Sequence, residues 1–315
     1  MKISGEVSYG LPLSKYDCID VRTVALPDGK HVPVLGQGTW KLGESKSARA
    51  GEISALRLGI ELGMTLIDTA EMYGDGGAED VVGESIHGQH KDVFVVTKVY
   101  PHNASHVELP KACQGSLTRL GLEAIDLYLL HWRERRPPLR ETVETFEELR
   151  LARSIRRWGV SNFGVDDMKE LMSLEQGRKC SANQVLYNLE NREIEFDLLP
   201  FLASNTTSAH GRVRRGEPHT SYFPVIAYSP VGHSGGLLKN AALKKIAKSH
   251  GATPAHVALA WVLRQPGVIA IPKASNQEHV RANARAIDIE LTKENLAALD
   301  REFPPPQTKQ PLPML

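Results

Sequence analysis

The sequence predicts an α/β protein, a single (β/α)8 barrel of the TIM-barrel type with an N-terminal β-hairpin. Eight short apolar runs alternate with amphipathic segments, and no composition break separates the two halves. A chain of 315 residues is long enough for one barrel, which needs roughly 250. A doubly wound sheet would carry G-x-G-x-x-G after its first strand, where this chain has GQGTWK instead. We expect residues 1–18 to be an N-terminal extension and residues 19–315 to form the barrel domain.

The elements follow in a regular order. Asp28-Gly29 predicts the turn of the hairpin. Several of the apolar runs are β-branched and apolar on both faces, as is typical of buried parallel strands. The predicted strands are 34–38, 64–68, 93–98, 125–131, 155–160, 182–186, 224–228 and 268–271. The segments between them have helical periodicity, and we expect Pro110 to lie in the first turn of its helix.

One connection differs from the others. The stretch from Ser204 to Tyr222 is polar and has no period of 2 or 3.6 residues. It joins a predicted helix to the following strand, so we expect a mobile surface loop on the barrel face opposite the active site.

Composition and charge exclude several classes of function. The net charge of +1 gives no reason to expect binding to nucleic acid or to an anionic membrane. No apolar run approaches the roughly 20 residues of a membrane span, and the N-terminus lacks the features of a signal or transit peptide. Three cysteines and no spaced Cys/His pattern predict neither disulfides nor a metal site. We therefore expect a cytoplasmic monomer or weak dimer whose partner is a small molecule.

Chemically useful side chains stand where consecutive strands end, which is where a barrel has its active site. Asp68, Lys98 and His131 end the second, third and fourth predicted strands, and Tyr73 follows the second. An ammonium beside Tyr73 favours the phenolate and makes the phenol a better acid. The set can protonate an oxyanion while a hydride arrives at carbon. The structural alternative is an ion pair in the barrel mouth beside a packing tyrosine.

Several longer motifs carry a family resemblance. They are GMTLIDTAEMYGDGGAEDVVGESI, VFVVTKVYP, IDLYLLHW, RRWGVSNF, NQVLYN, IAYSPVG and IPKASNQEHVRANA. Together they resemble an aldo-keto reductase from about Leu35 to Pro304. Within that family the chain is most similar to bacterial reductases that act on methylglyoxal, which share GQGTW and TAEMY.

The resemblance implies a reductase of small aldehydes and ketones that transfers a hydride from NADPH. Its implied catalytic residues are Asp68, Tyr73, Lys98 and His131. Its implied cofactor residues are Ser161, Asn162 and Gln184 at the nicotinamide carboxamide, Tyr228 under the ring, Lys273, Ser275, Asn276, His279 and Asn283 around the adenosine, and Thr39, Trp40 and Ser229. Its implied substrate pocket is lined by Trp40, Tyr100 and Trp132.

The last predicted helix bears on the choice of cofactor. Ser275-x-x-Glu278 is a capping-box pattern, and a helix N-terminus beside Lys273 suits a phosphate. The family often has an arginine where this chain has His279, so we expect NADPH to be preferred over NADH by a modest margin.

Two alternative functions stay open. One is a non-catalytic NADP-binding regulatory subunit, which a measurement of turnover would exclude. The other is a phosphate-sugar lyase or isomerase, which needs no nicotinamide and which a cofactor titration would distinguish from a reductase.

Overall fold

The computed structural model describes residues 22–205, 222–233 and 235–315. The predicted N-terminal extension and most of the predicted 204–222 loop lie outside these residues. The eight barrel strands are short, two to six residues each. They are β3 (Gln37–Gly38), β4 (Leu66–Asp68), β5 (Phe94–Val99), β6 (Leu127–Leu130), β7 (Trp158–Ser161), β8 (Asn183–Leu186), β9 (Val225–Tyr228) and β10 (Val268–Ala270).

These strands form one parallel sheet in the order β10-β9-β8-β7-β6-β5-β4-β3. The sheet closes because the segment around β3 pairs with the chain around β10. Gly36 N donates to Ala270 O at 2.8 Å and Ala270 N donates to Val34 O at 2.8 Å, and Gly38 forms a parallel bridge with Lys273. The predicted barrel is therefore confirmed, and every strand overlaps its predicted run.

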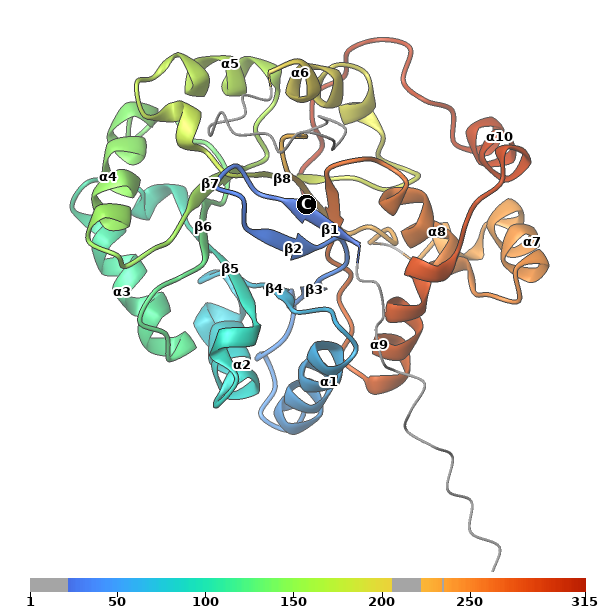
Figure 1. Cartoon of the computed structure of the whole chain (residues 1–315), viewed down its shortest axis with the longest axis horizontal. Helices are drawn as coiled ribbons and strands as arrows, with labels where there is room; N and C mark the ends of the chain where they lie inside the picture. The colour runs from blue at the N-terminus through green and yellow to red at the C-terminus, as the bar shows by residue number, and fades with distance from the viewer. Residues whose placement is uncertain (1–21, 206–221, 234) are drawn as a thin grey trace, which may run out of the picture.

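Helices surround the barrel on all sides (Figure 1). They are α1 (Arg49–Glu61), α2 (Gly77–Ile86), α3 (Glu108–Leu120), α4 (Leu139–Leu151), α5 (Val165–Ser173), α6 (Leu198–Ser204), α7 (Ala241–Ser249), α8 (Pro254–Leu263), α9 (Gln277–Ala284) and α10 (Lys293–Glu302). The strands are buried on both faces, and Ile67, Val96 and Leu127 are fully inaccessible. Burying each such side chain contributes roughly 1.5–3 kcal/mol.

The predicted hairpin is also confirmed. β1 (Thr23–Ala25) pairs antiparallel with β2 (His31–Pro33), and Gly29 adopts a φ of 87° in the turn. The hairpin contacts chain segments that precede barrel strands: Arg22 donates to Leu263 O, and Asp28 pairs with Arg157. It therefore covers the end of the barrel where the strands begin, away from the ends that carry the predicted site.

Two local expectations have different outcomes. Pro110 lies at the third position of α3, in the first turn as predicted. The predicted cap at Ser275 is wrong by one residue, because α9 begins at Gln277 and Asn276 is its N-cap. The Asn276 side chain accepts a 2.8 Å hydrogen bond from the His279 backbone N–H. Asn is as good an N-cap as Ser, so the local pattern alone did not separate the two.

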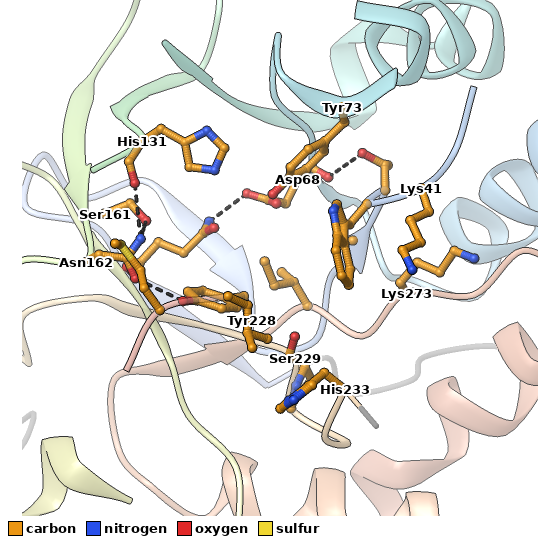
Figure 2. A pocket seen from close by; sticks show the side chains of 18 of the residues that line it. Lys41, Asp68, Tyr73, His131, Ser161, Asn162, Tyr228, Ser229, His233 and Lys273 are labelled. Carbon is orange, nitrogen blue, oxygen red and sulfur yellow. Dashed lines mark hydrogen bonds between the residues drawn. The ribbon is translucent and has the colours of Figure 1, made fainter. Parts of the chain in front are cut away.

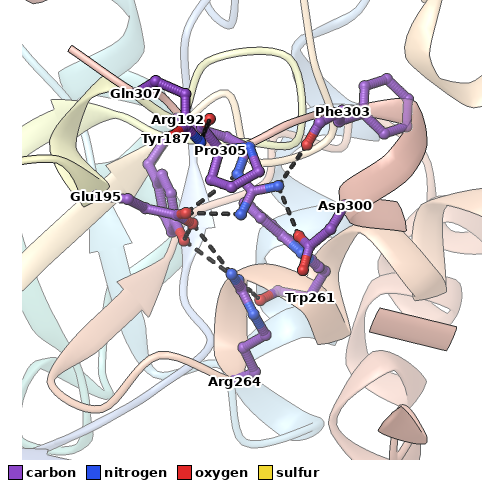
Figure 3. A network of polar contacts seen from close by, with 9 residues as sticks. All are labelled: Tyr187, Arg192, Glu195, Trp261, Arg264, Asp300, Phe303, Pro305 and Gln307. Carbon is purple, nitrogen blue, oxygen red and sulfur yellow. Dashed lines mark hydrogen bonds and ion pairs between the residues drawn. The ribbon is translucent and has the colours of Figure 1, made fainter. Parts of the chain in front are cut away.

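The C-terminal segment is fixed to the barrel by a polar network, which we call the C-terminal clamp: Arg192, Glu195, Arg264 and Asp300 (Figure 3). Arg192 pairs with Glu195 at 2.7 Å and with Asp300 of α10 at 2.8 Å. Arg264 reaches the second oxygen of Glu195 at 3.0 Å. The clamp therefore holds the end of α10, from which the chain runs on to its last residue.

Candidate active site

The carboxyl ends of the strands open into a cavity of about 460 Å³ (Figure 2). Every barrel strand except β5 contributes a lining residue, either within the strand or just beyond its end. The predicted residues that line the cavity are Thr39, Trp40, Asp68, Tyr73, His131, Trp132, Ser161, Asn162, Gln184, Tyr228, Ser229 and Lys273. Parallel strands bring residues far apart in the sequence to one rim, so this arrangement follows from barrel closure.

Asp68 and Lys98 form a buried ion pair beneath the cavity. Lys98 Nζ lies 2.8 Å from Asp68 Oδ2, and the two side chains are 0% and 3% exposed. The β4–β5 register places them on adjacent strands, and Thr39 Oγ1 holds the backbone of Asp68 by donating to its carbonyl at 2.9 Å. A buried charge needs such a partner, because each ion has given up its water.

All three hydrogens of the Lys98 ammonium are used. They go to Asp68, to Thr69 O at 2.7 Å and to Tyr73 Oη at 3.2 Å. An ammonium has donors and no acceptor, so the Tyr73 oxygen accepts and its own hydrogen points elsewhere. Tyr73 lines the cavity, and the phenol is therefore arranged as a hydrogen donor toward it.

Burial sets the protonation of this group. It raises the pKa of Tyr73 above its ordinary value; Lys98 opposes the rise and Asp68 adds to it. Burial lowers the pKa of Lys98, but Asp68 and Tyr73 raise it by more, so the ammonium stays charged. The expectation that Lys98 pulls the pKa of Tyr73 down is right in sign, but burial outweighs it. Tyr73 is therefore protonated at neutral pH.

His131 lies beside Tyr73 at the cavity as a neutral imidazole. Its ring centroid is 5.8 Å from that of Tyr73, at an edge-on angle of 76°. Burial, reinforced by the charge of Lys98, lowers the pKa of His131 to about 2. A neutral imidazole beside a phenol can hydrogen-bond and orient a carbonyl oxygen without competing as an acid.

The residues predicted at the nicotinamide carboxamide lie side by side. Asn162 donates to the carbonyl of His131 and to Ser161 Oγ, both at 3.2 Å, and it accepts from Tyr228 Oη at 3.0 Å. Ser161 Oγ donates to Gln184 O at 3.0 Å. Burial raises the pKa of Tyr228 to about 12, so it too is a neutral donor. The result is a rigid polar wall that presents amide and hydroxyl groups beside an aromatic ring.

Backbone strain is concentrated in the same place. Lys41, Asn162 and Ser229 have φ values of 65°, 61° and 48°, and all three line the cavity. Side-chain-bearing residues avoid this left-handed region at a cost of about 1–3 kcal/mol each. Such strain is common at binding sites, where the surrounding packing holds a side chain in a required direction.

Some predicted residues lie elsewhere. Tyr100 does not line the cavity, because its ring stacks on His102 at 4.6 Å and meets Trp132 edge-on at 5.8 Å. It lies behind Trp132. The predicted adenosine residues beyond Lys273 are also outside the cavity. Ser275, Asn276 and His279 are exposed at the start of α9, and Asn283 is buried one turn further on.

Sequence reasoning missed several lining residues, among them Lys41, His233, Met314 and Leu315. The first two had a signal, because Lys41 follows Trp40 and His233 lies in the loop after β9. The last two had none. The short tail without aromatics predicted an open pocket, whereas the tail returns to the cavity and contributes part of its wall.

Two features are absent from residues 22–205, 222–233 and 235–315. None of their helices is long and apolar enough to cross a membrane. None of their clusters of His, Cys, Asp or Glu has three members placed to hold a metal ion.

Known proteins match this chain over most of its length. The model of the aldo/keto reductase family matches residues 34–302. Methylglyoxal reductase YeaE of Escherichia coli is 48% identical over 288 residues, which cover 90% of this chain and 95% of that protein. The structure of an aldo-keto reductase from Klebsiella pneumoniae in complex with NADPH is 46% identical, with a TM-score of 0.86 over 94% of this chain and 99% of that one. A thermostable aldo-keto reductase, Tm1743, gives 35% identity and a TM-score of 0.78 over 89% and 99%.

Proposed function

Because the chain belongs to the aldo-keto reductase family, we propose that it reduces small aldehydes and ketones to alcohols with NADPH, using Tyr73 as the general acid. The observation that supports this proposal is that the Lys98 ammonium donates all three of its hydrogens, to Asp68, Thr69 and Tyr73. It leaves the Tyr73 hydroxyl hydrogen free to point into the cavity, which is what proton donation to a substrate requires.

The residues at the cavity fit a nicotinamide cofactor. Ser161, Asn162 and Gln184 offer donors and acceptors that match a carboxamide, and the Tyr228 ring beside them offers a face for stacking. Lys273 and the N-terminus of α9 supply positive charge for a phosphate. When bound, the reduced cofactor supplies the hydride, and the protein supplies position and electrostatics.

The chain's own residues handle the proton. Tyr73 donates its hydrogen to the carbonyl oxygen as negative charge develops there. Lys98, 3.2 Å away, then stabilises the phenolate, and Asp68 keeps the ammonium in place. His131 hydrogen-bonds the carbonyl oxygen and orients the carbonyl, and it cannot take the proton because its pKa is about 2.

The cavity walls support small substrates, including α-dicarbonyls of the kind that the E. coli relative's name implies. Trp40 and Trp132 form aromatic walls of the cavity. Met314 and Leu315 of the tail form a further, non-aromatic wall. A compact carbonyl compound fits this enclosure beside a bound nicotinamide, whereas a large one would have to displace the tail.

The test is a panel of carbonyl compounds, methylglyoxal among them, assayed with NADPH and with NADH. We expect substrate-dependent NADPH oxidation, a lower catalytic efficiency with NADH, and no loss after dialysis against a chelator. Tight NADPH binding without turnover of any carbonyl would instead support the non-catalytic regulatory subunit. No NADPH binding at all would exclude both.

A further inference from the structure

Gln184 makes a contact that its role at the carboxamide does not require. Its Nε2 donates to Asp68 Oδ1 at 2.6 Å, across 116 residues of sequence. The other carboxylate oxygen of Asp68 accepts from Lys98, and Lys98 in turn reaches Tyr73. Gln184, Asp68, Lys98 and Tyr73 therefore form one continuous chain of hydrogen bonds at the floor of the cavity.

The orientation of the Gln184 amide is fixed by this contact. An ionised carboxylate only accepts, so the nitrogen must face Asp68 and the carbonyl oxygen must face away from it. Gln184 lines the cavity, and its Oε1 has no hydrogen-bond partner among the described residues of the chain. That oxygen is an acceptor for the amide hydrogens of a carboxamide, while the nitrogen stays on Asp68.

We propose that Gln184 is a positioning residue that connects the nicotinamide subsite to the proton donor, acting on Tyr73 through Asp68 and Lys98. This inference rests on the proposed function and deepens it. Ser161 and Asn162 lie at the same subsite, but their hydrogen bonds go to Gln184 O, to each other, to His131 O and to Tyr228. Among these three residues, Gln184 alone contacts the ion pair.

The sign of the effect follows from electrostatics. The Gln184 N–H favours the ionised form of Asp68 and lowers its pKa against the rise caused by burial. It also places the positive end of the amide dipole against the carboxylate, which reduces the negative potential at Tyr73. Asp68 raises the pKa of Tyr73, so removal of the Gln184 donor should raise it further.

The other charged and titratable groups of the cavity must stay constant for this comparison. Besides Asp68 and Tyr73, they are His131 after β6, Tyr228 from β9, Lys41 after β3, His233 after β9 and Lys273 after β10, with Lys98 of β5 beneath them. The variants below change none of them, so a difference in titration reports on Gln184.

The experiment titrates Tyr73 in cofactor-free protein by NMR of 13Cζ-labelled tyrosine, with the signal assigned by its loss in Tyr73→Phe. Gln184→Met should raise the pKa of Tyr73 by a few tenths to about one unit. Gln184→Glu, which keeps the side-chain volume and adds a second carboxylate, should raise it more. The matched control is Ser161→Ala, which removes a neighbouring hydroxyl that does not touch Asp68 and should leave the titration at its wild-type position.

NADPH binding, measured by fluorescence quenching, separates the two roles. Gln184→Met and Ser161→Ala should both weaken it, each by about tenfold, and only the former should shift Tyr73. If Tyr73 titrates alike in the wild type, Gln184→Met and Gln184→Glu, the connection does not exist. Either Gln184 variant suffices if the other fails to fold. A wild type that binds no NADPH would defeat the proposed function, while the titration of Tyr73 would still decide this inference.

Discussion

The ion pair of the active site and the C-terminal clamp are both networks of charged side chains in one barrel, the first fully buried and the second only partly, and their polar groups are used differently. In the clamp, Arg192 donates to Glu195, Asp300 and the carbonyl of Phe303. Arg264 donates to Glu195 and to the Tyr187 hydroxyl and the Trp261 carbonyl. The two guanidinium groups also lie 4.9 and 3.8 Å from the centroid of the Trp261 ring.

In the active site the corresponding groups keep unused hydrogen-bonding capacity that faces the cavity. The Tyr73 hydrogen, the Gln184 oxygen and the imidazole of His131 all border the cavity. His131 Nδ1 is buried without a hydrogen-bond partner in the described part of the chain. A network that is satisfied internally stabilises the fold, whereas one with unused donors and acceptors is arranged for a ligand. Mutations in the active site should therefore lower activity more than stability. Mutations in the clamp should lower stability more than activity.

The largest effect is expected at Tyr73. Tyr73→Phe removes the proton donor and keeps the ring, so kcat should fall on the order of 10² to 10⁴-fold. The melting temperature and NADPH affinity should change little, because the hydroxyl makes one long contact to Lys98. Steady-state kinetics and fluorescence titration measure the two quantities. Turnover near the wild-type rate would remove Tyr73 from its proposed role.

The clamp should show the opposite pattern. Arg192→Met leaves Asp300 without its partner and Glu195 with only Arg264, so the free energy of unfolding should fall by about 2–4 kcal/mol. We expect kcat to stay within about threefold of wild type, because no clamp residue lines the cavity. Chemical denaturation gives the stability, and Arg178→Met, at an exposed arginine, is the control. A large loss of kcat with unchanged stability would reverse the comparison.

A pH effect of intermediate size is expected from His131. Burial and Lys98 hold its folded pKa at about 2, against about 6.5 when unfolded. As the pH falls, His131 is therefore protonated in the unfolded chain before it is protonated in the folded one. The free energy of unfolding decreases as the pH falls below about 6.5. Between pH 7.5 and 4.5 the wild type should lose about 1–3 kcal/mol more than His131→Gln. Denaturation at the two pH values tests this, with exposed His102→Gln as control. Equal losses in all three proteins would mean that His131 is protonated in the folded state.

The smallest effect concerns cofactor choice at the start of α9. His279 is exposed beside the Asn276 cap, where an arginine would add a bidentate phosphate ligand. His279→Arg should raise the NADPH-to-NADH ratio of catalytic efficiencies by roughly 3–10-fold. Kinetics with both cofactors measure the ratio. An unchanged ratio would place the adenosine phosphate away from this helix.

The sequence alone determined the parts of this protein that depend on local pattern. Short apolar runs and helical periods predict which segments are strands and which are helices. They do so because burial on one or both faces produces a pattern of apolar residues within a few positions of each other. Asp68, Lys98 and His131 could be identified for the same reason. Once a strand is predicted correctly, the residues at its end are known. Boundaries were less secure, and the start of α9 shifted by one residue because Ser275 and Asn276 are equally good caps.

Only the tertiary structure decided which of these groups meet. The contacts from Gln184 to Asp68 and from Arg192 to Asp300 span 116 and 108 residues, and they exist only once the barrel closes and the tail docks. The return of Leu315 to the cavity and the position of Tyr100 behind Trp132 likewise have no local signal. The pKa of Tyr73 was misjudged from its charged neighbour alone, because desolvation is a property of everything that surrounds a side chain and not of the residue itself.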